Sequence, residues 1–95
     1  MGNTNGPYKN KPVVVDTSTN WVYLGIFTGE DDAYVMLEEV DAFDLSETSL
    51  SKHEYLLMVK KDGIAPNREK IKIFKNKVVA ITLLEDIIRN EKSNI

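Results

Sequence analysis

Residues 70–81 read KIKIFKNKVVAI, and this stretch constrains the fold more than any other part of the chain. Apolar and polar residues alternate on both sides of Lys75-Asn76-Lys77, which is the pattern of strands with one buried face. Three polar residues leave room only for a tight turn, and Asn76 suits one because asparagine tolerates a positive φ angle better than most side chains. The stretch therefore predicts two strands joined by a tight hairpin, which is either a binding site or only a corner of a small barrel.

Three more strands are predicted upstream of this hairpin, at residues 13–15, 21–28 and 34–39, and the third can continue through Val40 and Phe43. The stretch WVYLGIFT at residues 21–28 is rich in aromatic and branched residues that favour strands. Gly25 lies in its middle and predicts a sharp bend or a close approach of two backbones, as a small barrel needs at a corner.

A helix is predicted at residues 51–62. Ser51 and Glu54 have the spacing of a capping box, in which their side chains satisfy free backbone N–H groups. Gly63 is suited to end the helix in a left-handed conformation, and Pro66 prevents its continuation. We expect this helix to cover the core by burying Leu56, Met58 and Val59, although a role as a docking surface stays open.

The length of 95 residues predicts one domain, at residues 13–90, with a flexible tail at 1–12 and a frayed end at 91–95. No apolar run approaches the ~20 residues of a membrane-spanning helix, so no membrane partner is expected. The chain has no cysteine, which excludes disulfides and is typical of a cytoplasmic protein.

Charges are separated along the chain. Residues 30–47 hold eight acidic residues and no lysine or arginine, whereas residues 60–77 hold seven basic residues and two acidic ones. This separation fits two solvated faces, head-to-tail association of complementary patches, or a basic face that meets a polyanion. The net charge of −3 lowers the expectation of general nucleic-acid binding.

Residues 12–86 resemble the Sm-like family in the order of their elements and in two motifs. The segment 22–26, VYLGI, matches the glycine-bent second strand of the family, and 35–40, VMLEEV, matches its third strand. The segment 73–81, IFKNKVVAI, is similar in outline to the second family motif. The resemblance implies a mainly β fold, a small five-stranded SH3-type barrel. The predicted helix departs from the family, because it is inserted between strands three and four instead of preceding the first strand.

In the Sm-like family the turn between strands four and five lines the pore of a ring and contacts RNA. The motif residues that do so are mostly changed here. Tyr34 replaces the asparagine of the first motif and Glu30 its aspartate, while Phe74 and Lys75 replace the arginine and glycine of the second motif, and Asn76 is kept. Most of the base-binding set of the family is therefore absent.

Some RNA-binding chemistry could persist, because an aromatic ring can stack on a base and a lysine can pair with phosphate. The opposite reading is that Tyr34 packs in the sheet and that the lysines only keep a hairpin soluble. A basic ridge on the strand after Asn67 has the same two readings, phosphate contact or protection of an edge strand. The candidate RNA-binding residues are Tyr34, Arg68, Lys75, Asn76 and Lys77.

No catalytic or metal-binding pattern is present in the sequence. His53 is the single histidine and is expected to be exposed on the helix. The acidic residues between strands three and four lack the spacing of a known metal loop and are expected to be hydrated; they are Asp41, Asp44, Glu47 and Glu54. We therefore expect a non-enzymatic protein without cofactor or metal.

The resemblance implies self-association through strands four and five. Two functions stay open at this point: weak RNA binding by such an oligomer, or a protein-interaction or scaffold domain with no role in nucleic-acid binding.

Overall fold

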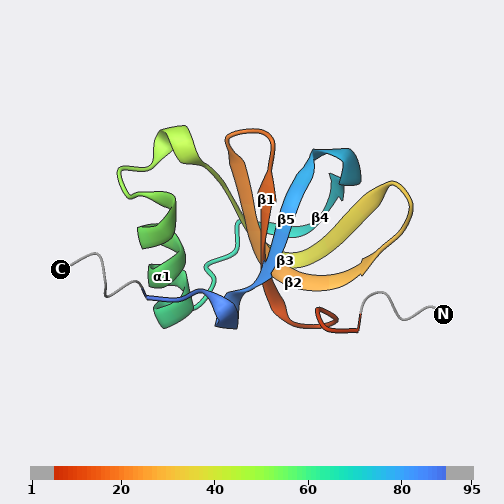
Figure 1. Ribbon diagram of the computed structural model, residues 1–95, viewed down its shortest axis with the longest axis horizontal. Coiled ribbons are helices and arrows are strands. Elements are labelled where there is room, and N and C mark those ends of the chain that lie inside the picture. The colour runs from red at the N-terminus through yellow and green to blue at the C-terminus, as the bar shows by residue number, and fades with distance from the viewer. Residues whose placement is uncertain (1–5, 90–95) are drawn as a thin grey trace.

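The computed structural model describes residues 6–89 and forms a five-stranded antiparallel sheet with one α-helix (Figure 1). The main elements are β1 (Pro12–Thr17), β2 (Trp21–Glu30), β3 (Tyr34–Asp44), α1 (Lys52–Asp62), β4 (Arg68–Phe74) and β5 (Val78–Leu83). Three short 3₁₀ turns complete the chain: η1 (Leu45–Glu47), η2 (Lys75–Lys77) and η3 (Leu84–Asp86). The predicted mainly β fold, with its helix between strands three and four, is confirmed.

The strand order is β4-β3-β2-β1-β5, so β4 and β5 form the two opposite edges of the sheet. The prediction of a tight hairpin at Lys75–Lys77 is wrong, because within residues 6–89 β4 pairs with β3, β5 pairs with β1, and no ladder joins β4 to β5. The sheet curls until its edges approach each other, and η2 crosses from one edge to the other (Figure 1). Asn76 also lacks the expected positive φ, which among the described non-glycine residues occurs at Asn10 and Glu39.

The bend of β2 at Gly25 is confirmed and has a partner on β3. Leu24 pairs with Asp41 and Ile26 with Glu38, so two residues of β3, Glu39 and Val40, stand opposite the single Gly25. Such a β-bulge bends the strand and increases the twist of the sheet. The first residue of the bulge, Glu39, has a φ of 51°. A Cβ atom at Gly25 would lie 3.0 Å from the Glu38 carbonyl oxygen, so the two backbones can approach this closely only at a glycine.

The curled sheet buries a hydrophobic cluster on each face. The larger cluster fills the inside of the curl around Val13, Val15 and Phe27. The second cluster lies on the other face, where Val14, Val22 and Leu24 meet α1 and η3. All three valines of β1 are fully buried because this strand is covered on both sides.

Helix α1 begins with the predicted capping box, which is confirmed. The Ser51 side chain accepts a hydrogen bond from the Glu54 N–H, and the Glu54 side chain accepts one from the Ser51 N–H. Leu56 and Val59 are buried against the sheet, as predicted. The predicted burial of Met58 is wrong, since its side chain is 42% exposed. Leu56 and Val59 share one face at a spacing of three residues, whereas Met58 points to the opposite side.

The segment before β1 is attached to the sheet from Tyr8 onward. The Tyr8 ring packs on Phe27 with 5.7 Å between centroids, the Asn10 N–H donates to the Phe27 carbonyl, and the Phe27 N–H donates to the Lys11 carbonyl. The prediction of a flexible tail at 1–12 does not account for these contacts. Its first five residues, and the end predicted to fray at 91–95, lie outside the described residues. None of the helices in residues 6–89 has the length and apolar character needed to span a membrane.

Candidate nucleic-acid interface

The turn between β2 and β3 is built around Asp31. Its Oδ1 accepts hydrogen bonds from the backbone N–H groups of Ala33 at 2.9 Å and Tyr34 at 2.8 Å. These two bonds, with smaller contributions from the charges of Lys72 and Lys75, lower the pKa of the Asp31 carboxyl below its usual value. The turn is therefore a fixed anionic element beside the start of β3.

Lys75 holds this turn against η2. Its backbone N–H donates to the Ala33 carbonyl at 2.8 Å, and its Nζ donates to the Asp31 carbonyl at 2.8 Å. The same Nζ forms an ion pair with Glu30 at 2.7 Å. The positive charge of Lys75 is therefore matched within the protein, and its main role here is to join the two turns.

Tyr34 and Phe74 form an aromatic pair across β3 and β4. The two residues are direct partners in the register, and their ring centroids lie 5.4 Å apart with a 42° tilt. Lys72 places its Nζ 5.2 Å from the centroid of the Tyr34 ring. Phe74 is 61% exposed, so this group offers an aromatic face and a cation to solvent. Stacking faces beside cations are the general means of binding single-stranded nucleic acid.

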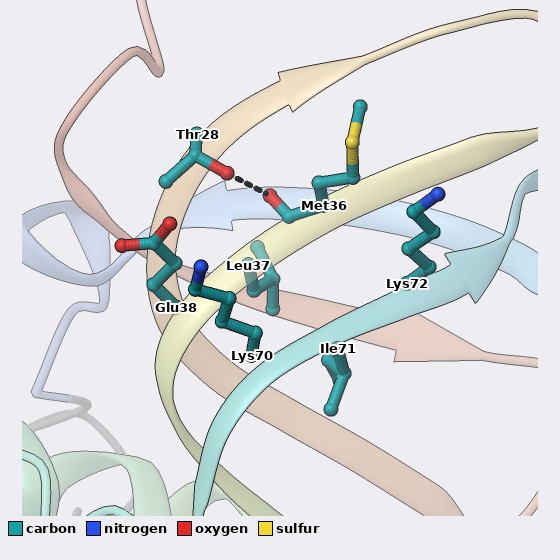
Figure 2. A pocket seen from close by; sticks show the side chains of 7 residues that line it. All are labelled: Thr28, Met36, Leu37, Glu38, Lys70, Ile71 and Lys72. Atoms are coloured by element: carbon teal, nitrogen blue, oxygen red, sulfur yellow. Dashed lines mark hydrogen bonds between the residues drawn. The ribbon is translucent and has the colours of Figure 1, made fainter.

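The same face of the sheet continues away from the turns. Residues two apart on a strand point to the same side, so Tyr34, Met36, Lys70, Lys72 and Phe74 line one surface, which we call the outer strip. Figure 2 shows a shallow hollow in this strip, with Lys70 beside Glu38 and with Lys72 farther along β4. Thr28 closes one side of the hollow by donating from its Oγ1 to the Met36 carbonyl at 3.2 Å.

The pairing of β3 with β4 brings part of the acidic segment of the sequence next to part of the basic segment. Glu38 from the acidic segment stands directly opposite Lys70 from the basic segment. At this position acids and bases that are distant in sequence become cross-strand neighbours, which is a stabilising arrangement in an antiparallel pair. Here the two segments do not form separate charged faces.

The five predicted RNA-binding residues are distributed over different parts of the molecule. Tyr34 and Lys75 lie together at the two turns. Asn76 is exposed in η2. Lys77 lies apart from Tyr34 and Lys75, directly before β5, where its carbonyl accepts a hydrogen bond from the Ser18 N–H. Arg68 lies at the far end of β4, opposite Val40. Whether these residues bind RNA stays a prediction.

The sequence prediction left out Phe74 and Lys72 as site residues. Phe74 was noted only as a replacement for an arginine, yet alternation along β4 places it on the same face as Lys70 and Lys72. This spacing of two residues was visible in the sequence. The pairing of Phe74 with Tyr34 was not, because it depends on the register of β3 against β4. The predicted exposed position of His53 in the first turn of α1 is confirmed.

Comparison with solved structures finds this fold in proteins of quite different sequence, among them the following two. A chain of the Pyrococcus abyssii Sm protein, solved in complex with a uridine heptamer, matches with a TM-score of 0.55 and 20% identity over 81% of this chain and 87% of that chain. A chain from the NatC complex bound to CoA matches with a TM-score of 0.57 and 11% identity over 93% of this chain and 99% of that chain. No family model and no curated protein matches the sequence.

At these identities the likeness concerns the fold, and it agrees with the features described above. The strand order, the glycine-bent β2 and the short turn between the two edge strands occur together in this molecule. By its architecture and its match to a solved Sm protein, the chain has the Sm-like fold.

Proposed function

We propose that this chain is a non-enzymatic assembly module that joins copies of itself through the two edge strands of its sheet. One observation carries the proposal: within residues 6–89 the outer edges of β4 and β5 have no partner strand. An unpaired edge presents a row of backbone donors and acceptors with which another chain can pair. Pairing β4 of one copy with β5 of the next would satisfy both edges in a single type of contact.

The side chains of the two edges favour unlike over like pairing. β4 carries Arg68, Lys70 and Lys72, so two β4 strands brought together would place like charges opposite each other. β5 reads VVAITL and has no charge, and its Val79 is 70% exposed. A head-to-tail arrangement therefore covers the exposed apolar side chain of β5 and separates the cationic strands. Such heterologous contacts generate closed rings or open filaments.

The test is the solution mass of the protein at micromolar concentration, measured by sedimentation velocity and light scattering. The unchanged chain is expected to form an oligomer. Val79→Lys is expected to weaken assembly by about tenfold or more, because it adds a lysine opposite the basic β4 of the next copy. Ile88→Lys is the matched control, since Ile88 is 75% exposed and lies outside the edge strands. A strict monomer for the unchanged chain, or an equal effect of both variants, would rule out the proposed contact.

A second candidate function is weak binding of single-stranded RNA at the outer strip. The observation that favours it is the exposed Phe74 ring beside Tyr34, with the Lys72 ammonium over the Tyr34 ring. The Pyrococcus Sm protein of similar fold is known in complex with a uridine heptamer. The loss of the motif residues and the internal pairing of Lys75 oppose strong or base-specific binding.

Binding of a labelled seven-nucleotide oligouridine, followed by fluorescence anisotropy at low salt, tests this candidate. Phe74→Ala together with Lys72→Gln is expected to weaken binding by about tenfold, since stacking on one aromatic side chain contributes about 1–3 kcal/mol per base. Affinity is also expected to fall as salt increases. Lys61→Gln, at the exposed end of α1, is the control for a general loss of charge. Absence of binding by the unchanged protein at low salt would eliminate this function.

A further inference from the structure

A second hollow lies on a different part of the molecule, between the end of β3, the turn η1 and helix α1. Three acidic residues line it, Asp41, Asp44 and Glu47, together with three aromatic residues, Trp21, Phe43 and Tyr55. No lysine or arginine is among its lining residues. The hollow shares no lining residue with the one in the outer strip.

Asp41 is the distinctive group of this hollow because it is an acid only 5% exposed to solvent. Its Oδ2 accepts a hydrogen bond of 2.6 Å from the Tyr55 hydroxyl. No donor among residues 6–89 contacts its Oδ1, and no described lysine or arginine forms an ion pair with it. A buried carboxylate is costly unless a cation or several hydrogen bonds compensate its charge. One oxygen of Asp41 is therefore left without a partner in the wall of the hollow.

The Asp41–Tyr55 bond has a fixed direction, with the Tyr55 hydroxyl as donor and Asp41 Oδ2 as acceptor. Burial, followed by the hydrogen bond to Asp41 and the charge of that residue, raises the pKa of Tyr55 to about 12. The hydroxyl therefore keeps its proton and donates it to Asp41 at neutral pH. Hydrogen bonds from the Ser46 hydroxyl and N–H lower the pKa of the Asp44 carboxyl below its usual value, which favours its charged form.

The aromatic walls narrow the kind of cation that suits this hollow. The Phe43 and Tyr55 rings are stacked with centroids 4.0 Å apart. Trp21 also lines the hollow and is the partner of Asp44 in the β2–β3 register. Aromatic faces attract cations that spread their charge over a flat group. Among the residues that the structure describes, no three acidic or imidazole groups converge closely enough to hold a metal ion.

We propose that this hollow binds the guanidinium group of an arginine side chain presented by a peptide segment of a partner protein. A guanidinium group is planar, stacks on aromatic rings and donates to carboxylates through several N–H groups at once. We expect its N–H groups to donate to the unpartnered Oδ1 of Asp41, on the side of β3 that faces Tyr55, while Asp44 and Glu47 add negative charge to the lining of the hollow. The site is independent of the edge-strand assembly proposed above.

The test uses the blocked peptide acetyl-Gly-Gly-Arg-Gly-Gly-amide at constant ionic strength. Trp21 is the single tryptophan of the chain and lines the hollow, so its fluorescence and its indole N–H signal report occupancy. The arginine peptide is expected to change both signals in a saturable manner. The same peptide with citrulline, a neutral analogue of similar shape, is expected to cause no saturable change.

Variants separate this site from a general attraction of cations to an acidic protein. Asp44→Asn with Glu47→Gln is expected to weaken binding by about tenfold or more. The control, Glu85→Gln with Asp86→Asn, removes the same charge from exposed positions outside the lining residues. Asp41→Asn keeps an acceptor for Tyr55 and is expected to lose binding while unfolding at the same urea concentration as the control.

Several results would overturn the proposal. It fails if the arginine peptide gives no saturation up to about 10 mM, a weaker affinity than any specific site would need. It also fails if citrulline binds as well as arginine, or if the two double variants lose affinity equally. Equal binding of a lysine peptide would overturn the assignment to a guanidinium group.

Discussion

Phe27→Ala is expected to lower the free energy of unfolding by about 3–5 kcal/mol, the usual cost of removing a large aromatic side chain from a protein core. Phe27 is completely buried and lies in the cluster inside the curled sheet. It also carries the contacts that attach the segment before β1, through the Tyr8 ring and two backbone hydrogen bonds. The substitution thus leaves a cavity and loosens a second part of the chain.

Urea unfolding followed by Trp21 fluorescence measures this effect, with Ile88→Ala as the surface control. The control is expected to stay within about 0.5 kcal/mol of the unchanged protein. Because domains of this size have only about 5–15 kcal/mol of stability, Phe27→Ala can leave the protein largely unfolded. Phe27→Leu keeps most of the apolar volume and is expected to lose only about 1.5 kcal/mol. A loss below about 1 kcal/mol for Phe27→Ala would contradict the central position of this residue.

Gly25→Val is the second change with a large expected effect, a loss of about 3 kcal/mol in the free energy of unfolding. A Cβ atom at this position would lie 3.0 Å from both the Glu38 carbonyl oxygen and Val40 Cγ2, and 3.3 Å from Val40 Cα. Two of these three atoms belong to the backbone of β3, so they cannot move without disturbing the bulge. The two γ-methyl groups of valine increase the crowding.

A substitution at Gly63 tests the second reason for which a protein needs glycine, an unusual backbone conformation, without the crowding by neighbouring atoms that occurs at Gly25. Gly63 has a φ of 92°, and a Cβ added there would meet no atom within 4 Å. Because its ψ of 165° places it in a region that is essentially open only to glycine, Gly63→Ala is expected to cost about 1–3 kcal/mol from backbone strain alone. Midpoints of urea unfolding give both values. Gly25→Val with the midpoint of the unchanged protein would mean that β2 and β3 do not approach each other as described.

Local features of the sequence were sufficient to predict most of the elements. The strand that became β4 was predicted because Ile71 and Ile73 alternate with Lys70 and Lys72. The start of α1 followed from the capping box, since its two hydrogen bonds involve residues only three apart. In both cases the residues that determine the structure are neighbours in the chain.

The arrangement of these elements could not be predicted in the same way. Alternation identifies β4 and β5 as strands but carries no information about their partners, so the hairpin was wrongly inferred from their short connection. The left-handed conformation of Glu39 is imposed by the bulge opposite Gly25 and has no signal in its side chain. Tertiary contacts decide both features.

The composition of the candidate sites could not be predicted from neighbouring residues in the sequence either. Asp41 was expected to be hydrated with the other loop acids, yet it is buried because Tyr55, fourteen positions later, folds over it from α1. The pairing of Tyr34 with Phe74 brings together residues forty positions apart. The residue types in the sequence were sufficient to predict stacking and charge interactions. Which residues come together in a site depended on the register of β3 against β4 and on the position of α1.

The turn η2 has a consequence for the geometry of any assembly built on the edge strands. It joins β4 directly to β5 through only three residues, Lys75–Lys77, and it can span the two edges of one subunit because the curl of the sheet holds them at a fixed angle. In a head-to-tail chain of copies that angle becomes the rotation from each subunit to the next, and its fit into a full circle determines closure. The number of subunits in such an assembly would then follow from the curl of the sheet that this short turn spans.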